Sequence, residues 1–201
     1  MAPLQERIDS FDARVDAWVE RHRSPSLDRV FYGLSTAADH GMLWHAVGVA
    51  RAALRRDPRY ALRFSTALGA ESALTNGGVK SLFRRVRPQE HFAHADPLPY
   101  GMRRPITSSF PSGHATTAFM CAGVLAKRPR TALPWFALAA LVAGSRVYVR
   151  MHHASDVLAG AALGLALVPA ARRFVTRDGR GTKDGRGTRD GRGKRGDRTR
   201  Q

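Results

Sequence analysis

The chain has 201 residues, and its 33 lysines and arginines against 16 aspartates and glutamates give a net charge of +17. A chain of this length suits a single domain, and its one cysteine, Cys121, excludes an intramolecular disulfide. The positive excess favours an anionic partner, whether a phosphate ester, an anionic lipid or a nucleic acid, and composition does not choose among the three.

The first predicted element is an N-terminal amphipathic helix within residues 1–30. Its apolar positions at helical spacing are Leu4, Ile8, Phe11, Val15, Trp18 and Val19. Charged residues stand between them, which is typical of a helix with one apolar face, and the segment lacks the apolar region of a cleaved secretory signal. Such a helix can lie on a membrane surface or pack on another helix, and both interpretations need the same pattern.

Five apolar stretches follow, at about residues 34–50, 60–79, 114–126, 132–149 and 155–171. They predict an all-α fold, in which a domain over residues 31–173 forms a membrane-embedded bundle of about five or six helices. The strongest stretches are the last two, although the last is near the short end for crossing a hydrocarbon core of about 30 Å. A soluble helical bundle is the alternative, because buried core helices of this length are apolar as well.

Basic residues gather at alternate ends of these stretches, at 51–63, at 127–130 and after residue 171. Because cytoplasmic loops are enriched in Lys and Arg, these ends are predicted to be cytoplasmic in a multi-pass protein of the cell membrane. The intervening loops, at 80–104 and 150–153, then lie on the extracytoplasmic face. With five crossings, the N-terminal helix lies on that face too.

Three short motifs fall at the ends of apolar stretches on that face. They are K-x6-RP, with Lys80, Arg87 and Pro88; PSGH, at residues 111–114; and SR-x5-H-x3-D, with Ser145, Arg146, His152 and Asp156. Lys80, Arg87 and Arg146 supply fixed positive charges for the oxygens of a transferred phosphate group. Preorganised cations of this kind can stabilise phosphoryl transfer in the place of a metal ion.

Two histidines have neighbours that can set the protonation state and the orientation of their rings. His152 and Asp156 are four residues apart, which on a helix places both on one face, where the carboxylate can accept the Nδ1 proton of the ring. Pro111 and Ser112 precede an apolar helical run that begins near His114. A helix N-terminus suits phosphate oxygens, and Gly113 lets the backbone approach them closely. His114 is placed there to donate a proton to the leaving oxygen and then to activate water.

With every position of the three motifs present, the chain resembles the type 2 phosphatidic acid phosphatase (PAP2) family, and within it the membrane lipid phosphate phosphatases. The resemblance implies that His152 is the nucleophile, forming a phosphohistidine, and that Asp156 orients it. It implies metal-independent hydrolysis of a phosphate monoester or diphosphate of a membrane lipid, with no metal and no other cofactor. The expected partners are the lipid phosphate substrate and membrane lipids, and no nucleic acid.

The motifs recognise only the phosphate that the substrates of such a family share. The abundance of Ala and Arg is typical of a GC-rich genome, and short actinobacterial proteins of this kind resemble phosphatases of the polyprenyl-linked cell-wall pathway. Polyprenyl phosphates are therefore expected ahead of glycerophospholipids.

Two other functions stay open at this point. The vanadium-dependent haloperoxidases are similar in all three motifs, because vanadate mimics a pentacoordinate phosphorus. A non-catalytic basic membrane scaffold would use the tail, residues 174–201, whose TRDGRG repeats predict disorder. The tail is expected to be a solvated terminus rather than a lipid-binding one, because its aspartates dilute its positive charge.

Other charged residues near the motifs are expected to have lesser roles. His153 should shape the pocket as a neighbour of the nucleophile, and residues 89–110 should form a loop that covers it. His91, His94 and Asp96 are only a weak metal-binding pattern. The arginines expected to be solvated or to contact lipid headgroups are Arg84, Arg85, Arg103, Arg104 and Arg150.

Overall fold

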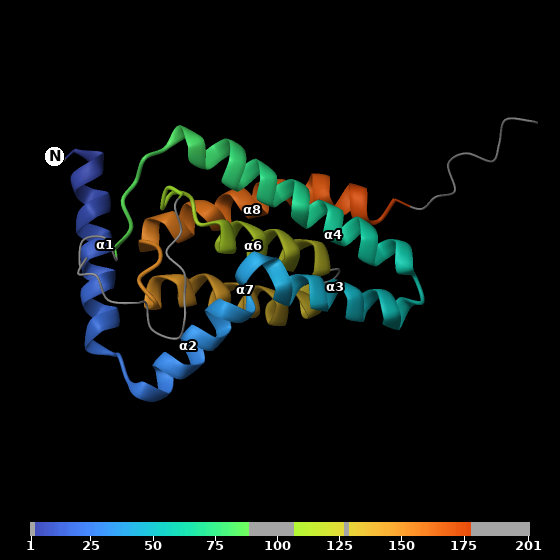
Figure 1. Cartoon of the computed structure of the whole chain (residues 1–201), viewed down its shortest axis with the longest axis horizontal. Coiled ribbons are helices and arrows are strands. Elements are labelled where there is room, and N and C mark those ends of the chain that lie inside the picture. The colour runs from blue at the N-terminus through green and yellow to red at the C-terminus, as the bar shows by residue number, and fades with distance from the viewer. Residues whose placement is uncertain (1–2, 89–106, 127–128, 178–201) are drawn as a thin grey trace, which may run out of the picture.

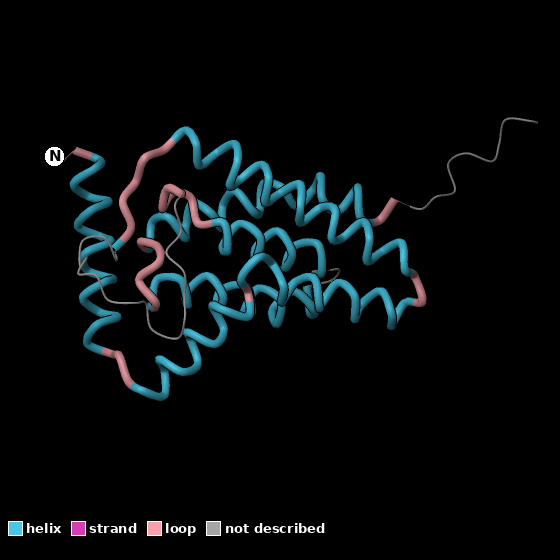
Figure 2. Tube along the Cα trace, in the orientation of Figure 1, coloured by secondary structure: helices cyan, strands magenta, loops and turns pink. Residues whose placement is uncertain are grey.

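The computed structural model describes residues 3–88, 107–126 and 129–177. All regular structure in these ranges is helical, and seven α-helices make up the bundle (Figures 1 and 2). The prediction of an all-α fold is therefore confirmed. The repeat tail falls outside the described residues from 178 onward, so its disorder stays a prediction.

The helices follow one another through short connections. They are α1 (Leu4–Arg21), α2 (Pro25–Ala37), α3 (Met42–Arg55), α4 (Pro58–Ser72), α6 (Gly113–Leu125), α7 (Pro129–Tyr148) and α8 (Ala154–Val175), with the shorter turns η1 (Asp39–Gly41), η2 (Ala73–Gly78) and η3 (Val79–Leu82). Pro25 opens α2 behind Ser24, whose side chain caps the first turn. α4 begins in the same way, at Pro58 behind Asp57. Both starts follow the usual preference for a polar cap and a proline in the first turn.

The apolar stretch predicted at 34–50 is not one helix. α2 ends and α3 begins around His40 and Gly41, whose φ angles are +53° and +71°. This left-handed backbone does not continue a right-handed helix. The break places Asp39 beside the start of α6, where it contacts His114.

α6 lies in the middle of the bundle and packs most extensively on α8 (Figure 1). Two glycines of α8 make the contact close. A Cβ on Gly160 would lie 2.4 Å from the backbone oxygen of Ser112, and one on Gly164 would lie 2.3 Å from that of Thr116. Small residues one turn apart allow this approach between helices, as they do in membrane helix pairs. The start of α6, which carries the second motif, is thereby fixed against α8.

α1 runs across the end of the bundle where α6 and α8 begin, and the α3–α4 connection lies at the opposite end (Figure 1). Phe11, Val15 and Val19 of α1 belong to an apolar cluster with Val147 and Tyr148 of α7. Of the two roles predicted for the amphipathic helix, packing on other helices is therefore present in the structure.

Arginines close the opposite end of the bundle. Nε of Arg172 donates to the carbonyl of Gly123 at 2.8 Å, and its NH2 group donates to that of Ala126. Arg63 donates to the carbonyl of Val175 at 3.4 Å. These carbonyls belong to the last turns of α6 and α8, where the helix itself offers no N–H partner.

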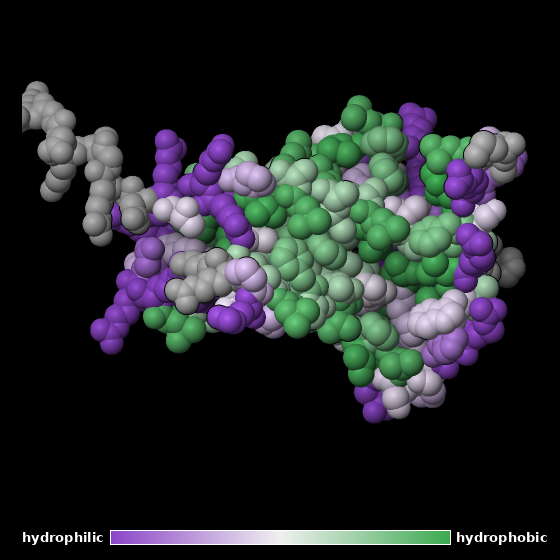
Figure 3. All heavy atoms as spheres, turned by 180° about the vertical axis from the view of Figure 1, so that it is seen from behind, coloured by the Kyte–Doolittle hydropathy of each residue, from purple (hydrophilic) through white to green (hydrophobic). Residues whose placement is uncertain are grey.

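One face of the bundle carries a band of apolar residues, the apolar belt. Figure 3 shows apolar residues over the middle of one face and hydrophilic residues toward both ends. Large exposed apolar side chains include Leu62, Leu133, Leu141, Leu158 and Leu165. In the described ranges one helix, α8, is long and apolar enough by length and composition to cross a membrane. An exposed apolar belt indicates a surface that is covered by lipid or by another apolar partner.

Gly164→Ala should loosen the contact between α6 and α8. The added methyl group meets backbone atoms that have no room to move, so we expect the free energy of unfolding to fall by about 1–3 kcal/mol. Gly144→Ala is the matched control, because a Cβ there meets nothing within 4 Å and alanine is the better helix former. Thermal unfolding in detergent micelles should show a lower midpoint for Gly164→Ala alone, and equal midpoints would contradict the close contact.

Candidate active site

The three motifs meet at the end of the bundle that α1 crosses, around a cavity of about 780 Å³. The motif residues that line it are Lys80, Arg87, Gly113, His114, Arg146 and His152. Ser112 and Asp156 are fully buried close to these residues. The structure thus brings together all eight residues that the sequence predicts for the site.

His152 lies in the turn between α7 and α8, one residue before the N-cap of α8. Its Nδ1 is 2.7 Å from the backbone oxygen of Ser109 and 3.8 Å from Oδ2 of Asp156. A ring nitrogen beside a carbonyl oxygen carries the proton, so Nε2 keeps its lone pair. The sequence predicts a helical pair in which Asp156 accepts this proton. The turn instead puts the carbonyl of Ser109 in that position.

The ring of His152 is kept neutral. Burial lowers the pKa of its imidazole to about 3, and the nearby charges of Arg87, Arg146 and Lys80 act in the same direction. The Asp156 carboxylate raises this pKa, but less than burial lowers it. Nε2, 3.4 Å from NH1 of Arg87, is therefore an unprotonated nitrogen at physiological pH, which is the form that can act as a nucleophile.

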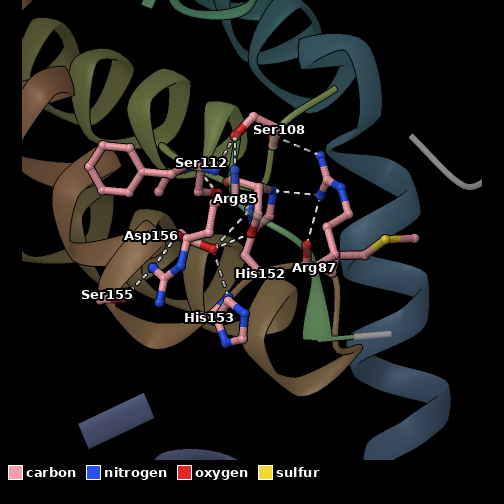
Figure 4. A network of polar contacts seen from close by, with 12 residues as sticks. Arg85, Arg87, Ser108, Ser112, His152, His153, Ser155 and Asp156 are labelled. Atoms are coloured by element: carbon pink, nitrogen blue, oxygen red, sulfur yellow. Dashed lines mark hydrogen bonds and ion pairs between the residues drawn. The ribbon is translucent and has the colours of Figure 1, made fainter. Parts of the chain in front are cut away.

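Asp156 is the centre of a hydrogen-bond network beside His152 (Figure 4). Its Oδ1 accepts a bond of 2.6 Å from NH1 of Arg85. Its Oδ2 accepts one of 2.9 Å from the backbone N–H of His153 and another from the hydroxyl of Ser109. Ser109 therefore contacts Asp156 through its hydroxyl and His152 through its carbonyl. The carboxylate therefore contacts the imidazole ring both directly, at 3.8 Å, and through this serine.

Arg87 ties two segments of the site together. Its NH1 donates to the carbonyl of Met151 at 2.7 Å, and its NH2 donates to those of Thr107 and Ser108 at 3.1 and 3.2 Å. The bonds join the segment before α6 to the turn that carries His152. Because Arg87 also lines the cavity, its charge is fixed next to the space where a phosphate would bind.

His114 is the second residue of α6, and its Nε2 lies 2.9 Å from Oδ1 of Asp39. The same carboxylate oxygen is 3.5 Å from NH1 of Arg146. Ser112 is the N-cap of α6, and its hydroxyl accepts a bond of 3.5 Å from the backbone N–H of Ala115. Ser112 therefore caps the helix N-terminus that faces the cavity.

Lys80 and Arg146 complete the positive lining. Both side chains are buried, and Nε of Arg146 has no hydrogen-bond partner among the described residues. The pKa of Lys80 is lowered to about 8, mainly by burial and also by the charges of Arg87 and Arg146. The charge of Asp156 raises this pKa by a smaller amount. Buried donors and close like charges are costly unless an anion joins them, so the arrangement suits an anionic ligand.

The contacts of two arginines differ from the prediction. The sequence predicts that Arg85 and Arg150 are solvated or contact lipid headgroups, and this is wrong. Arg85 forms ion pairs with Asp12 at 2.7 Å and with Asp156 at 2.6 Å, and Arg150 pairs with Asp16 at 3.2 Å. Both arginines bind carboxylates of the protein itself.

Ser109 and Asp39 are two polar residues of the site that the motifs do not include. The sequence does contain one indication that Asp39 belongs to the site, because an acidic residue inside an apolar stretch is often functional. The predicted loop over the pocket lies outside the described residues as far as residue 106, together with His91, His94, Asp96, Arg103 and Arg104. Within the described ranges, no group of three or more His, Cys, Asp or Glu side chains could hold a metal ion.

Comparison with known proteins gives the family. The PAP2 superfamily matches residues 60–180, more than half of the chain, so the chain belongs to the PAP2 superfamily. A transmembrane PAP2-type phosphatidylglycerolphosphate phosphatase from Bacillus subtilis has a similar structure, with a TM-score of 0.65 and 26% identity over 84% of this chain and 86% of that one. LpxE from Aquifex aeolicus has the same fold, with a TM-score of 0.64 and 22% identity over 81% of this chain and 94% of that one.

A curated relative is the lipid A 1-phosphatase of Porphyromonas gingivalis, which is 38% identical over 74 residues. That match covers 33% of this chain and only 17% of the relative, so the chain spans a small part of the relative's length. The resemblance drawn from the three motifs is therefore confirmed at the level of the superfamily.

The pKa of Lys80 determines how anion affinity should depend on pH. With a pKa of about 8, the ammonium is charged below this pH and neutral above it, so affinity for a dianion should fall as the pH rises past 8. Tungstate keeps its own charge over this range and is a suitable probe. Calorimetry should show a loss approaching roughly tenfold per pH unit in the wild type. Lys80→Arg should show none, since arginine stays charged, and equal pH dependence of the two proteins would contradict the assignment.

Proposed function

We propose that the protein hydrolyses a phosphate monoester or diphosphate of a membrane lipid through a phosphohistidine at His152, without a metal ion or other cofactor. The observation that carries the proposal is the position of His152, whose ring is bonded through Nδ1 to the carbonyl of Ser109 and lines a cavity together with the three cationic motif residues. Phosphoryl transfer depends on positioning and on charge stabilisation, and a nucleophile among fixed cations supplies both.

In the first half-reaction, Nε2 of His152 attacks phosphorus, and the N–P bond forms as the P–O bond to the lipid breaks. The equatorial oxygens of phosphorus bind Lys80, Arg87 and Arg146, together with the N-terminus of α6. The Nδ1 proton stays bonded to the carbonyl of Ser109, which stabilises the positive charge that the ring gains.

His114 carries the protons. It donates one to the departing oxygen and then takes one from the water that attacks the phosphohistidine and releases inorganic phosphate. Asp39, which contacts Nε2 of His114, orients this imidazole and favours its protonated form, against burial and the charges of Arg146 and Lys80, which favour the neutral form. The other product is a lipid alcohol, or a lipid monophosphate when the substrate is a diphosphate.

Residues outside the three motifs must recognise the lipid part of the substrate. The names of two relatives give lipid A and phosphatidylglycerolphosphate, which share little beyond phosphate on a lipid. The cavity extends from the motif residues to Met42, Trp44 and Leu68 on α3 and α4. Polyprenyl phosphates, ahead of glycerophospholipids, are the first substrates to test, and phosphate release across a panel of lipid phosphates would rank them.

We also propose that the bundle crosses the cell membrane several times, with the site on the extracytoplasmic face. The apolar belt supports this topology, as do the arginines of the α3–α4 connection at the end remote from the site and the transmembrane relative. α1, in residues 1–30, then lies along the membrane surface at the site end of the phosphatase domain, residues 31–173. Val175, the last residue of α8, then lies at the cytoplasmic end.

His152→Ala should abolish phosphate release, with a loss of roughly a thousandfold or more, because the covalent intermediate has no other acceptor. Excess EDTA should leave the wild-type rate unchanged. His153→Ala is the control and should keep most activity, since this ring is directed to the carbonyl of Val86 at 3.3 Å. A full dependence on Mg²⁺, or undiminished release by His152→Ala, would refute the mechanism.

The role of His114 predicts an effect that depends on the leaving group. A lipid alkoxide needs a proton as it departs, whereas p-nitrophenolate leaves without one. His114→Ala should therefore lose roughly 10²–10⁴-fold in kcat on a lipid phosphate and much less on p-nitrophenyl phosphate. Asp39→Asn should show the same pattern to a smaller extent. Equal losses on both substrates would rule out His114 as the general acid.

A further inference from the structure

α1 reaches the active site through one buried carboxylate. The side chain of Asp12 is buried, and its Oδ2 lies 2.7 Å from NH2 of Arg85. NH1 of the same guanidinium lies 2.6 Å from Oδ1 of Asp156, in the network that Figure 4 shows beside His152. One arginine therefore joins the first helix of the chain to the carboxylate that supports the nucleophile.

Asp12 also caps α8. Its Oδ1 accepts a bond of 2.9 Å from the backbone N–H of Ser155, and its Oδ2 accepts one of 2.6 Å from the hydroxyl of the same residue. Ser155 is in the first turn of α8, where backbone N–H groups have no partner within the helix. Because Asp12 takes this N–H, the carboxylate of Asp156 is left to bind His153, Ser109 and Arg85.

A second contact joins α1 to the turn that carries His152. Arg150 in this turn has a φ of +59°, a conformation that is unfavourable for a residue with a side chain. Its guanidinium pairs with Asp16 at 3.2 Å and with Glu20 at 2.9 Å, both on α1. Asp12 and Asp16, one turn apart on α1, thus contact the chain on both sides of His152, at Ser155 and at Arg150.

We propose that Asp12 is a positioning residue for phosphoryl transfer, which holds Arg85 against Asp156 and so fixes the ring of His152. α1 is then part of the catalytic apparatus and not only a surface helix. The inference rests on the proposed function. When the charge of Asp12 is removed, Arg85 interacts more strongly with Asp156. The carboxylate of Asp156 then turns away from Ser109, and the imidazole ring of His152 is no longer held in one orientation.

Asp12→Asn tests the proposal, because it keeps the size of the side chain and one acceptor oxygen. We expect kcat on a lipid phosphate to fall roughly ten- to hundredfold, as small displacements of reacting groups do. KM should change little, since Asp12 does not line the cavity. Asp9→Asn is the matched control: it removes the same charge from the same helix, but Asp9 is exposed and 3.9 Å from Arg85. Its kcat should equal that of the wild type.

A structural role for Asp12 would give a different result. The fraction of molecules trapped as phosphoenzyme by an alkaline quench, which preserves the N–P bond of phosphohistidine, counts the competent sites. A folding defect lowers this count without changing the rate per site. Positioning lowers the rate per site. If Asp12 acts through Arg85, the double variant Asp12→Asn/Arg85→Gln should be no slower than Arg85→Gln. A wild-type rate per site in Asp12→Asn, or losses that multiply in the double variant, would overturn the proposal.

A readout without substrate separates this proposal from the proposed function. Histidine side-chain resonances of labelled protein in micelles, assigned with His152→Gln, should shift for His152 in Asp12→Asn and not in Asp9→Asn. Failure of the proposed function would appear as no phosphate release by the wild type, whatever the resonances do. Unchanged His152 resonances in Asp12→Asn would overturn the positioning role even in an active phosphatase.

Discussion

The carboxylate of Asp156 is fully buried, and its oxygens need donors because an unpaired charge in an apolar interior is strongly destabilising. The donors come from separate parts of the chain: Arg85 in the first motif segment, Ser109 before the second, and the backbone of His153. Satisfying this one charge therefore requires the motif segments to meet. The position of His152 follows, since its ring is bonded to the same Ser109 that binds the carboxylate.

The scaffold around this carboxylate places it accurately. Asp156 is in the first turn of α8, and Gly160, one turn further, lets α8 touch the backbone of Ser112. The carbonyl of Asp156 also accepts the backbone N–H of Ser112 at 3.0 Å. The helix start that would bind phosphate and the carboxylate that supports the nucleophile are thus connected by direct contact. Neither can move without the other, which is the kind of rigidity that catalysis by preorganised charge requires.

The sequence predicted the helical bundle, its family and the residues that gather at the site. These predictions succeeded because apolar periodicity and motif spacing are local properties that are visible along the chain. What it missed depends on contacts between distant residues. Asp12 and Arg85 are 73 positions apart, and His114 and Asp39 are 75 apart, so no spacing rule links them. The spacing of His152 and Asp156 suggested one helix, whereas the left-handed backbone at Arg150 ends α7 and puts His152 in a turn.

The arginines that close the far end of the bundle have a consequence for how the protein is made. In the topology proposed above, Arg63 and Arg172 are retained in the cytoplasm while the helices insert, because Lys and Arg resist translocation. After assembly the same two side chains pair the last carbonyls of α6 and α8. If the chain has that topology, the residues that set its orientation also join the helix ends in the assembled bundle. In that topology, a helix inserted in the opposite direction would carry its arginine away from the carbonyls that it binds in the folded bundle.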